Sequence, residues 1–210
     1  MAKNITFDEF AHASFDCIKG DEVLGRFSLS VPGVHNAANA LSAIALGEKL
    51  GLSMEDIQKG LLHFGGTDRR FQYKGKVGGV TIIDDYAHHP TEIAATLRTA
   101  KNYPHRTTWC VFQPHTYTRT KALMHEFAEA LTLADKVVLA DIYAARETDN
   151  LGISSRNLRD LVASLGTDAY YFSTFDEIEE FLLKNCIHDD LLITMGAGDV
   201  YKIGENLLGM

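Results

Sequence analysis

The sequence contains few of the residues that build covalent frameworks. Its 210 residues include three cysteines, four prolines and one tryptophan. Cys17, Cys110 and Cys186 lie far apart, no CxxC pair is present, and an odd number leaves at least one thiol unpaired. These features exclude a disulfide-rich fold and a zinc or redox centre built on a CxxC pair. We expect reduced thiols that are mostly buried.

Long hydrophobic runs and clustered basic residues are missing as well. No apolar run approaches the ~20 residues that a helix needs to cross a bilayer, and the chain opens on polar residues rather than on a signal peptide. We therefore expect a cytoplasmic protein with no membrane partner. Lys and Arg number 20 against 28 Asp and Glu, a net charge of −8. This balance argues against a nucleic-acid partner, because backbone phosphates attract clustered basic side chains.

Two phosphate-binding motifs are also absent. Neither GxxxxGK[ST] nor GxGxxG occurs in the chain, so a triphosphate-holding loop, if the chain takes part in ATP chemistry, must lie on another segment. What is present is ordinary for a folded protein, with 46% apolar and 23% charged residues. The length of 210 residues indicates one or two domains.

Residues 1–68 read as an incomplete domain. Short strand-like runs cover 5–10, 13–20 and 23–32, and apolar residues at helical spacing follow from 37 to 50, with Gly51 placed as a helix stop. Ser53 and Asp56 resemble a capping box that opens a second helix through about His63. About 30 residues of strand cannot bury a core alone. We place a domain boundary in the glycine-rich loop near residue 68.

Residues 69–210 alternate between strands and helices. Strand-like runs occur at 79–86, 107–113, 136–141, 169–172 and 191–196, and helical runs at 90–102, 121–131, 154–166, 174–185 and 197–208. Pro90 suits a first helical turn, and Ser154 or Ser155 and Thr174 suit N-caps. This pattern predicts an α/β fold with a mostly parallel sheet and helices on both faces.

Ligands of open α/β sheets bind at the carboxyl ends of the strands, so the loops that follow the strands carry the functional predictions. Four of them are polar or glycine-rich: residues 84–90, 112–120, 141–147 and 196–199. Because parallel strands end at the same edge of a sheet, we expect these four loops to share one rim.

The first of these loops is the richest in titratable groups. Asp84, Asp85, Tyr86, His88 and His89 lie within six residues. A carboxylate directly after a strand can accept both hydroxyls of a ribose, and imidazoles, which titrate near neutrality, can hold a carboxylate or an amine. Two alternatives remain open, a metal site using Asp85 and His88 and structural capping of the following helix.

The second loop brings His115 and Arg119 to the entrance of a helix. Arginine is suited to two-pronged carboxylate recognition, and the start of the helix adds a favourable place for negative charge. The alternative is a solvated arginine beside a capping threonine.

Two further stretches could contact a nucleotide. Asn36 and Asn39 open a helix three residues apart, so both can face one side, and an amide can donate to and accept from an adenine edge. The alternative for Asn36 is a simple helix cap. Arg69 and Arg70 could meet phosphates or serve as linker charges.

The motifs GVHNAANA, RRF, DDYAHHPTEI, FQPHTYTRT and GAGDVYKIGENL occur in this order, and together they resemble the Mur ligase family over essentially the whole chain. DDYAHHPTE with FQPH is the specific part. The resemblance implies an enzyme with a UDP-sugar domain, a central ATPase domain and a C-terminal Rossmann-like domain. Residues 1–68 would then be the end of the central ATP-binding domain and residues 69–210 the whole C-terminal domain, so the phosphate-binding loop would lie on the absent part.

The resemblance also implies a reaction in peptidoglycan precursor synthesis. ATP would phosphorylate the carboxylate of UDP-N-acetylmuramate, and the amine of L-alanine would attack the acyl phosphate to form an amide. ATP and Mg²⁺ would be bound mainly through the absent part, so we expect the chain alone to be inactive. The alternatives are a recycling ligase that joins a ready-made peptide to the same sugar, a non-catalytic nucleotide-binding module, and a metal-dependent hydrolase built on His88, His89 and His115.

Carried over by position, the resemblance assigns two groups of site residues. Those expected to contact ATP are His35, Asn36, Asn39, Arg70 and Asp85, with Asp84 as a further candidate. Those expected to line the amino-acid and acyl side are Tyr86, His88, His115 and Arg119, of which the last three are expected to be catalytic. One position departs from the family pattern, because Thr116 stands where an arginine often follows the histidine of QPH. Either Arg119 alone holds the carboxylate, or a neighbour such as Arg146 helps.

Overall fold

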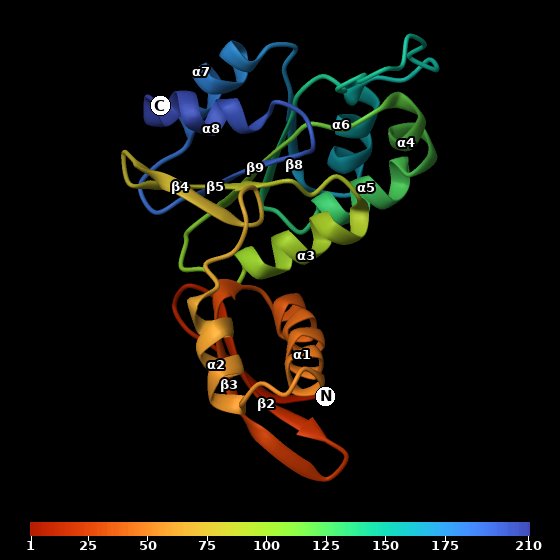
Figure 1. Cartoon of the computed structure of the whole chain (residues 1–210). Coiled ribbons are helices and arrows are strands. Elements are labelled where there is room, and N and C mark those ends of the chain that lie inside the picture. Colours follow the sequence, from red (N-terminus) through yellow and green to blue (C-terminus); the bar gives the residue numbers. More distant parts are fainter. The chain divides into compact units, whose positions relative to one another are not determined.

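The computed structural model describes all 210 residues and divides into two compact units (Figure 1). The first unit comprises Met1–Thr67 with Arg98–Pro104, and the second comprises Asp68–Leu97 with His105–Met210. Each unit has a sheet of its own, one of three strands and one of six.

The first unit is an antiparallel meander covered by two helices. Strands β1 (Ala2–Phe7), β2 (His12–Lys19) and β3 (Glu22–Pro32) follow one another, and α1 (Val34–Lys49) and α2 (Met54–His63) complete the unit. Alternate residues of β2 are buried, as expected for a sheet with one covered face. The fully buried rings of Phe15 and Phe27 stack at 5.9 Å in this core. All three predicted strands and both helices are present.

The helix starts of the first unit separate a correct prediction from a wrong one. Ser53 is the N-cap of α2, and its hydroxyl accepts a hydrogen bond from the Asp56 amide at 3.1 Å. In contrast, α1 starts three residues before the predicted residue 37 with Gly33 as its N-cap. Asn36 lies inside the first turn and donates from its side chain to the Pro32 carbonyl at 2.8 Å. Its alternative interpretation as a simple helix cap is therefore wrong.

The second unit is the predicted α/β fold, with a mostly parallel sheet. Its strands are β4 (Gln72–Val77), β5 (Val80–Asp85), β6 (Thr108–Phe112), β7 (Lys136–Leu139), β8 (Asp168–Tyr171) and β9 (Leu191–Met195). They are arranged in the order β4-β5-β9-β6-β7-β8. The five predicted strands pair in parallel. The central strands β6 and β9 are buried along their whole length, as expected for strands covered on both faces.

The sixth strand, β4, was not predicted. It pairs antiparallel with β5 at the edge of the sheet through a two-residue turn at Gly78 and Gly79. Both glycines have positive φ, 58° and 85°, the backbone that tight hairpins require and that glycine adopts without strain. The glycine pair between two strand-like runs is the sequence signal of this hairpin. No element was predicted for residues 72–77, so the prediction of five strands was one too few.

Helices cover both faces of this sheet (Figure 1). On one face, α7 (Phe175–Asn185) and α8 (Tyr201–Leu208) enclose a core that includes Ile82, Trp109 and Ile203. The other face carries α3 (Pro90–Ala100), α4 (Tyr117–Ala122), α5 (Met124–Leu131) and α6 (Ser155–Ser164). There the rings of Phe112 and Phe127 pack at 5.6 Å.

In the second unit, three of the predicted helix starts hold and two fail. Ser154 and Thr174 cap α6 and α7, both with capping boxes, and α3 begins at Pro90. The helix predicted for 121–131 instead begins at Tyr117 and is interrupted at Leu123, so that it forms two short helices. The last helix begins at Tyr201 rather than near 197, because the glycine-rich segment before it is a loop.

The structure describes the state of the cysteines and the character of the helices. All three cysteines are free thiols, with Cys17 and Cys110 buried and Cys186 half-buried. None of the helices combines the length and the apolar character that crossing a bilayer requires.

The central strand gives a test of this fold. Ile193 is fully buried and pairs with Ile83 on one side and Cys110 on the other. Ile193→Ala should lower the free energy of unfolding of the second unit by about 2–5 kcal/mol, because it deletes buried methyl groups and leaves a cavity. Urea unfolding followed by fluorescence measures this loss in the second unit alone, since Trp109 is the single tryptophan of the chain.

The matched control is Leu183→Ala, since the Leu183 side chain is 70% exposed. It should change the same free energy by less than about 0.5 kcal/mol. Equal losses for the two variants would contradict the assignment of β9 to the centre of the sheet.

Candidate functional site

The loops that follow β5, β9, β6 and β7 lie together at one edge of the sheet, because these neighbouring strands run parallel. Backbone hydrogen bonds continue past the strand ends into the loops. The Gly196 amide donates to the Asp85 carbonyl at 3.0 Å, and the Gln113 amide donates to the Met195 carbonyl at 3.0 Å. The prediction of a shared rim is therefore confirmed.

A row of four rings crosses this edge. The centroids of Tyr86 and His88 are 5.3 Å apart, those of His88 and His115 are 6.2 Å apart, and those of His115 and Tyr143 are 5.4 Å apart. The row joins the loops after β5, β6 and β7. The structure thus brings together three of the residues predicted for the amino-acid side, and it adds Tyr143, which sequence reasoning did not single out.

His88 is held in one orientation by its own loop. Its Nδ1 lies 3.0 Å from the Tyr86 carbonyl oxygen and 3.5 Å from a carboxylate oxygen of Glu92. Both partners are acceptors, so Nδ1 carries a hydrogen and the neutral ring has its lone pair at Nε2. The Glu92 carboxylate also accepts from the His88 amide at 3.1 Å, which fixes the start of α3.

His115 is held in its uncharged form. Burial is the main cause that lowers its pKa below the usual value, and the positive charge of Arg119 and the electrostatic interaction with His88 lower it further. The carboxylate of Glu147 opposes this shift by raising the same pKa. An imidazole that is neutral at physiological pH can accept a proton, which is the property required of a general base.

Buried polar atoms without a partner concentrate on the loop after β6. Five buried side-chain polar atoms of the chain have no hydrogen-bond partner within it, and three of these are Oε1 of Gln113, Nδ1 of His115 and Nη1 of Arg119. Buried polar groups of folded proteins are nearly always paired, so such a group calls for an explanation. Here a donor of arginine, a ring nitrogen and an amide oxygen lie within seven residues, which suits a ligand with both charged and polar groups.

The start of α4 binds a carboxylate of the chain itself. The Glu147 carboxylate accepts from the Tyr117 amide and from the Thr118 amide, and the Thr116 hydroxyl accepts from the Arg119 amide. The pKa of Glu147 is lowered, first by a hydrogen bond from the Thr118 side chain and further by the backbone amides of Thr118 and Tyr117. The predicted favourable place for negative charge at this helix start is present, and the carboxylate of Glu147 occupies it. Glu147 was not predicted.

The two aspartates at the end of β5 face different neighbours. Asp84 is 1% exposed and accepts from Arg69 Nε at 2.9 Å and from the Thr194 hydroxyl at 2.7 Å. Asp85 is 5% exposed and accepts from the amides of Phe71 and Ala87, both at 2.8 Å. Burial raises the pKa of Asp85, although these hydrogen bonds oppose the rise.

The two arginines before β4 also have different surroundings. The guanidinium of Arg69 donates to the Gly196 carbonyl at 2.7 Å and lies over the rings of Tyr86 and Tyr201, at 4.9 and 4.7 Å. Arg69 is therefore a structural link between the loops after β5 and β9. Arg70 is exposed, with its guanidinium 5.8 Å from the Tyr86 ring, and its predicted contact with ATP stays a prediction.

The predicted adenine contacts lie in the first unit. His35 and Asn39 are exposed on the first turns of α1, and the Asn39 side chain donates to the Asn36 side chain at 3.1 Å. The two amides therefore do face one side of the helix, as their spacing predicted. Their role toward a nucleotide stays a prediction.

No group of three or more His, Cys, Asp or Glu side chains is arranged to hold a metal ion. His89 is exposed, and its Nδ1 accepts from the Thr91 amide at 3.3 Å, so it does not join His88 and His115 in a ligand set. The Mg²⁺ that the family resemblance implies finds no set of ligands among these residues.

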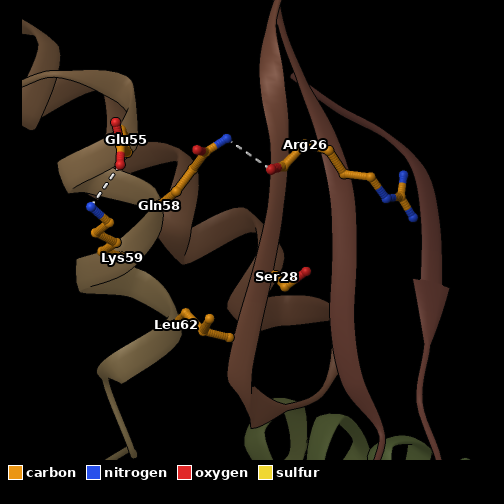
Figure 2. A pocket seen from close by; sticks show the side chains of 6 residues that line it. All are labelled: Arg26, Ser28, Glu55, Gln58, Lys59 and Leu62. Carbon is orange, nitrogen blue, oxygen red and sulfur yellow. Dashed lines mark hydrogen bonds and ion pairs between the residues drawn. The ribbon is translucent and has the colours of Figure 1, made fainter.

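The first unit has a hollow of about 290 Å³ between α2 and β3 (Figure 2). Gln58 donates to the Arg26 carbonyl at 3.0 Å, and Lys59 pairs with Glu55 at 2.7 Å. The Arg26 guanidinium points away from the hollow (Figure 2) and pairs with Asp16 at 2.9 Å. The polar groups drawn there already have partners, so the hollow is not the candidate site.

Comparisons with known proteins find relatives over nearly the whole chain. Residues 69–198 match the family described as "Mur ligase, glutamate ligase domain". The UDP-N-acetylmuramate–L-alanine ligase of Agathobacter rectalis is 60% identical over 206 residues, which cover 98% of this chain. The crystal structure of UDP-N-acetylmuramate–alanine ligase from Thermotoga maritima covers 99% of this chain with a TM-score of 0.84 and 29% identity. A murein peptide ligase from Psychrobacter arcticus has the same fold, with a TM-score of 0.67, 24% identity and 99% of this chain covered.

The chain spans less than half of these relatives. It matches 45% of the Agathobacter rectalis protein, 44% of the Thermotoga maritima protein and 43% of the Psychrobacter arcticus protein. The activities named for these relatives are those of proteins more than twice as long as the matched region.

The electrostatics of the site give a prediction. Arg119→Gln should raise the pKa of His115 toward its usual value, because the substitution removes a positive charge that lowers it. Histidine NMR titration of the 210-residue chain measures this pKa directly, with His115 assigned by its own substitution.

Arg159→Gln is the control, because Arg159 lies on α6 and pairs with Asp160 rather than with the site. It should leave the His115 pKa unchanged. If neither substitution changes the pKa of His115, the proximity of Arg119 and His115 is contradicted.

Proposed function

Because this chain belongs to the Mur ligase family, we propose that it is the C-terminal part of an ATP-dependent ligase that joins L-alanine to UDP-N-acetylmuramate. The overall reaction consumes ATP and yields an amide, ADP and phosphate, and it supplies peptidoglycan precursors. The 60% identity to the Agathobacter rectalis ligase supports this choice among family members. We propose a cytoplasmic site of action, because the reaction consumes ATP.

The observation that carries the proposal is the set of unpartnered polar atoms on the loop after β6. Nη1 of Arg119 and Nδ1 of His115 are buried without a hydrogen-bond partner in the chain. An α-amino acid carries a carboxylate and an ammonium group at neutral pH. A guanidinium suits the carboxylate, and a neutral imidazole suits the ammonium, from which it can accept a proton.

We propose the following roles in amide formation. Arg119 holds the carboxylate of L-alanine, and His115 takes a proton from its ammonium group, so that the free amine attacks the acyl phosphate and phosphate leaves. The lowered pKa of His115 suits this role, because burial keeps the ring uncharged before substrate binds. His88, whose lone pair lies at Nε2, and Tyr86 line the same side.

Thr116 stands at the position where arginine is frequent in the family. Its backbone has a φ of 67°, and its hydroxyl caps α4. In this proposal the carboxylate of the substrate relies on Arg119, because Arg146 is exposed on the neighbouring loop and no contact links it to the site.

The ATP contacts of Asp85 and Arg70 in the second unit, and of His35, Asn36 and Asn39 in the first, are part of the proposal. The bonds of Asp85 to two backbone amides leave its carboxylate with further lone pairs, and Asp85 is the last residue of β5, at the strand end where we expect a ribose hydroxyl to approach. We expect the triphosphate to be held by residues outside this chain, since the chain has no phosphate-binding loop motif.

The decisive experiment uses the full-length polypeptide to which this chain belongs. Release of ADP that requires both UDP-N-acetylmuramate and L-alanine, with formation of the amide product, would support the proposal, whereas the 210-residue chain alone should form no amide. Competition between L-alanine and a tripeptide acceptor tests the substrate. Preference for the tripeptide would overturn the L-alanine assignment in favour of a recycling ligase.

The role of Arg119 gives a quantitative prediction. Arg119→Ala should lower kcat/KM for L-alanine by about 10- to 100-fold, because a hydrogen bond to a charged group contributes about 1.5–3 kcal/mol. The KM for ATP should stay the same, since Arg119 is assigned to the amino acid. Steady-state kinetics of the full-length enzyme with each substrate varied in turn measures both values.

Arg159→Ala serves as the matched control and should leave kcat/KM for L-alanine unchanged. If Arg119→Ala raises the KM for ATP instead, Arg119 belongs to the nucleotide side, and our assignment of the amino-acid carboxylate is wrong.

A further inference from the structure

Tyr143 lies where the loops after β6 and β7 are joined by their backbones. Its amide donates to the Pro114 carbonyl at 2.8 Å, and its carbonyl accepts from the Thr116 amide at 2.9 Å. These two bonds enclose His115, which forms an isolated parallel bridge with Tyr143. The backbone of Tyr143 is thus fixed against the residues on both sides of His115.

The side chain of Tyr143 contacts the same histidine. The two rings are stacked, with an interplanar angle of 19° and centroids 5.4 Å apart. This geometry is close to the parallel arrangement of offset-stacked rings. Because the backbone of Tyr143 is held in the loop contact, the ring cannot move away from His115 without a change of rotamer.

The loop after β9 supports the ring from a third element. A Cβ atom at Gly198 would lie 3.0 Å from Cγ of Tyr143 and closer still to Oε1 of Gln113. Only a residue without a side chain lets this backbone approach so closely. The second glycine of the Gly-Ala-Gly motif therefore allows the loop after β9 to pack against Tyr143 and Gln113.

Burial in the hydrophobic core does not account for Tyr143. The residue is 39% exposed, and it is not part of the cluster between the sheet and α7 and α8. Its ring sits at the rim, between a histidine with an unpartnered buried nitrogen and a glycine loop. Such a position is expected for a residue that orients a neighbour.

We propose that Tyr143 is a positioning residue that holds the ring of His115 in place for the ligase reaction, an inference that rests on the function proposed above. Tyr143 acts through His115 and does not itself exchange a proton or bind the acceptor. The ring of Tyr143 limits the rotation of the imidazole and shields one side of it from water. Reacting groups need such positioning, since a shift of about 1 Å can cost ~100-fold in rate.

The test compares Tyr143→Ala, Tyr143→Leu and Tyr143→Phe in the full-length enzyme. Alanine removes the ring, leucine keeps bulk without a flat face, and phenylalanine keeps the stack. Tyr73→Ala on β4 is the matched control, since Tyr73 is 58% exposed and is not one of the four rings. Trp109 fluorescence of each variant verifies that the second unit is folded.

The alanine and leucine variants should lower kcat/KM for L-alanine by about 10- to 100-fold, the loss expected for a misplaced reacting group, with an unchanged KM for ATP. Phenylalanine should restore most of the lost rate. In the 210-residue chain, Tyr143→Ala should also raise the pKa of His115 measured by NMR. Burial is the main cause that lowers this pKa, Arg119 and His88 lower it further, Glu147 raises it, and loss of the ring reduces only the burial.

Full activity of a folded Tyr143→Leu variant would overturn the proposal, because bulk alone would then suffice. An unchanged His115 pKa in Tyr143→Ala would also overturn it. The NMR measurement needs no ligase activity, so it separates the two claims. If the wild-type enzyme forms no amide while the pKa rises as expected, the proposed function is wrong and the contact between Tyr143 and His115 stands.

Discussion

The parallel hydrogen-bond ladder of the second sheet continues beyond its strands, and the candidate site depends on this continuation. The Gly196 amide still pairs with the Asp85 carbonyl after β9 has ended, and the Thr116 amide still pairs with the Tyr143 carbonyl after β6 and β7 have ended. Loops normally move more than the elements they connect. Here their backbones are joined to one another, so side chains from different loops keep defined distances without a ligand.

The carboxylates at the end of β5 also hold a neighbouring segment in place through hydrogen bonds. Asp84 binds Arg69 and Thr194, while Asp85 binds the amide of Phe71. Successive residues of a strand point to opposite faces, so the two aspartates hold the segment before β4 by hydrogen bonds on both faces of the strand. Arg69 and Phe71 both have positive φ, 59° and 45°, a backbone that costs free energy for residues other than glycine. The buried hydrogen bonds to the aspartates offset this cost.

Much of this architecture could be predicted from the sequence, because the strands of the second unit are short apolar runs and several helices carry capping residues such as Ser53 and Thr174. The edge strand β4 was missed since its residues are mostly polar and its signal is the glycine pair of the turn. Residues with distinctive chemistry, His88, His115 and Arg119, were found by their place after strands. Tyr143 and Glu147 were not, because their importance comes from what they contact, and contacts between loops have no local pattern in a sequence.

The Glu147 carboxylate at the start of α4 makes the stability of the loop after β6 more sensitive to acid than to alkali. The pKa of Glu147 is lowered in the folded chain, so its stabilising contribution is present above the unfolded pKa and is lost as the pH falls through the folded one. The pKa of His115 is lowered as well, and for a histidine this means that the unfolded state takes up its proton first, which again favours unfolding on the acid side. Acidification therefore weakens the cap and charges the imidazole, two changes of the same sign in one short segment. Mild alkali changes the protonation of neither group, so these two effects do not weaken the loop at alkaline pH.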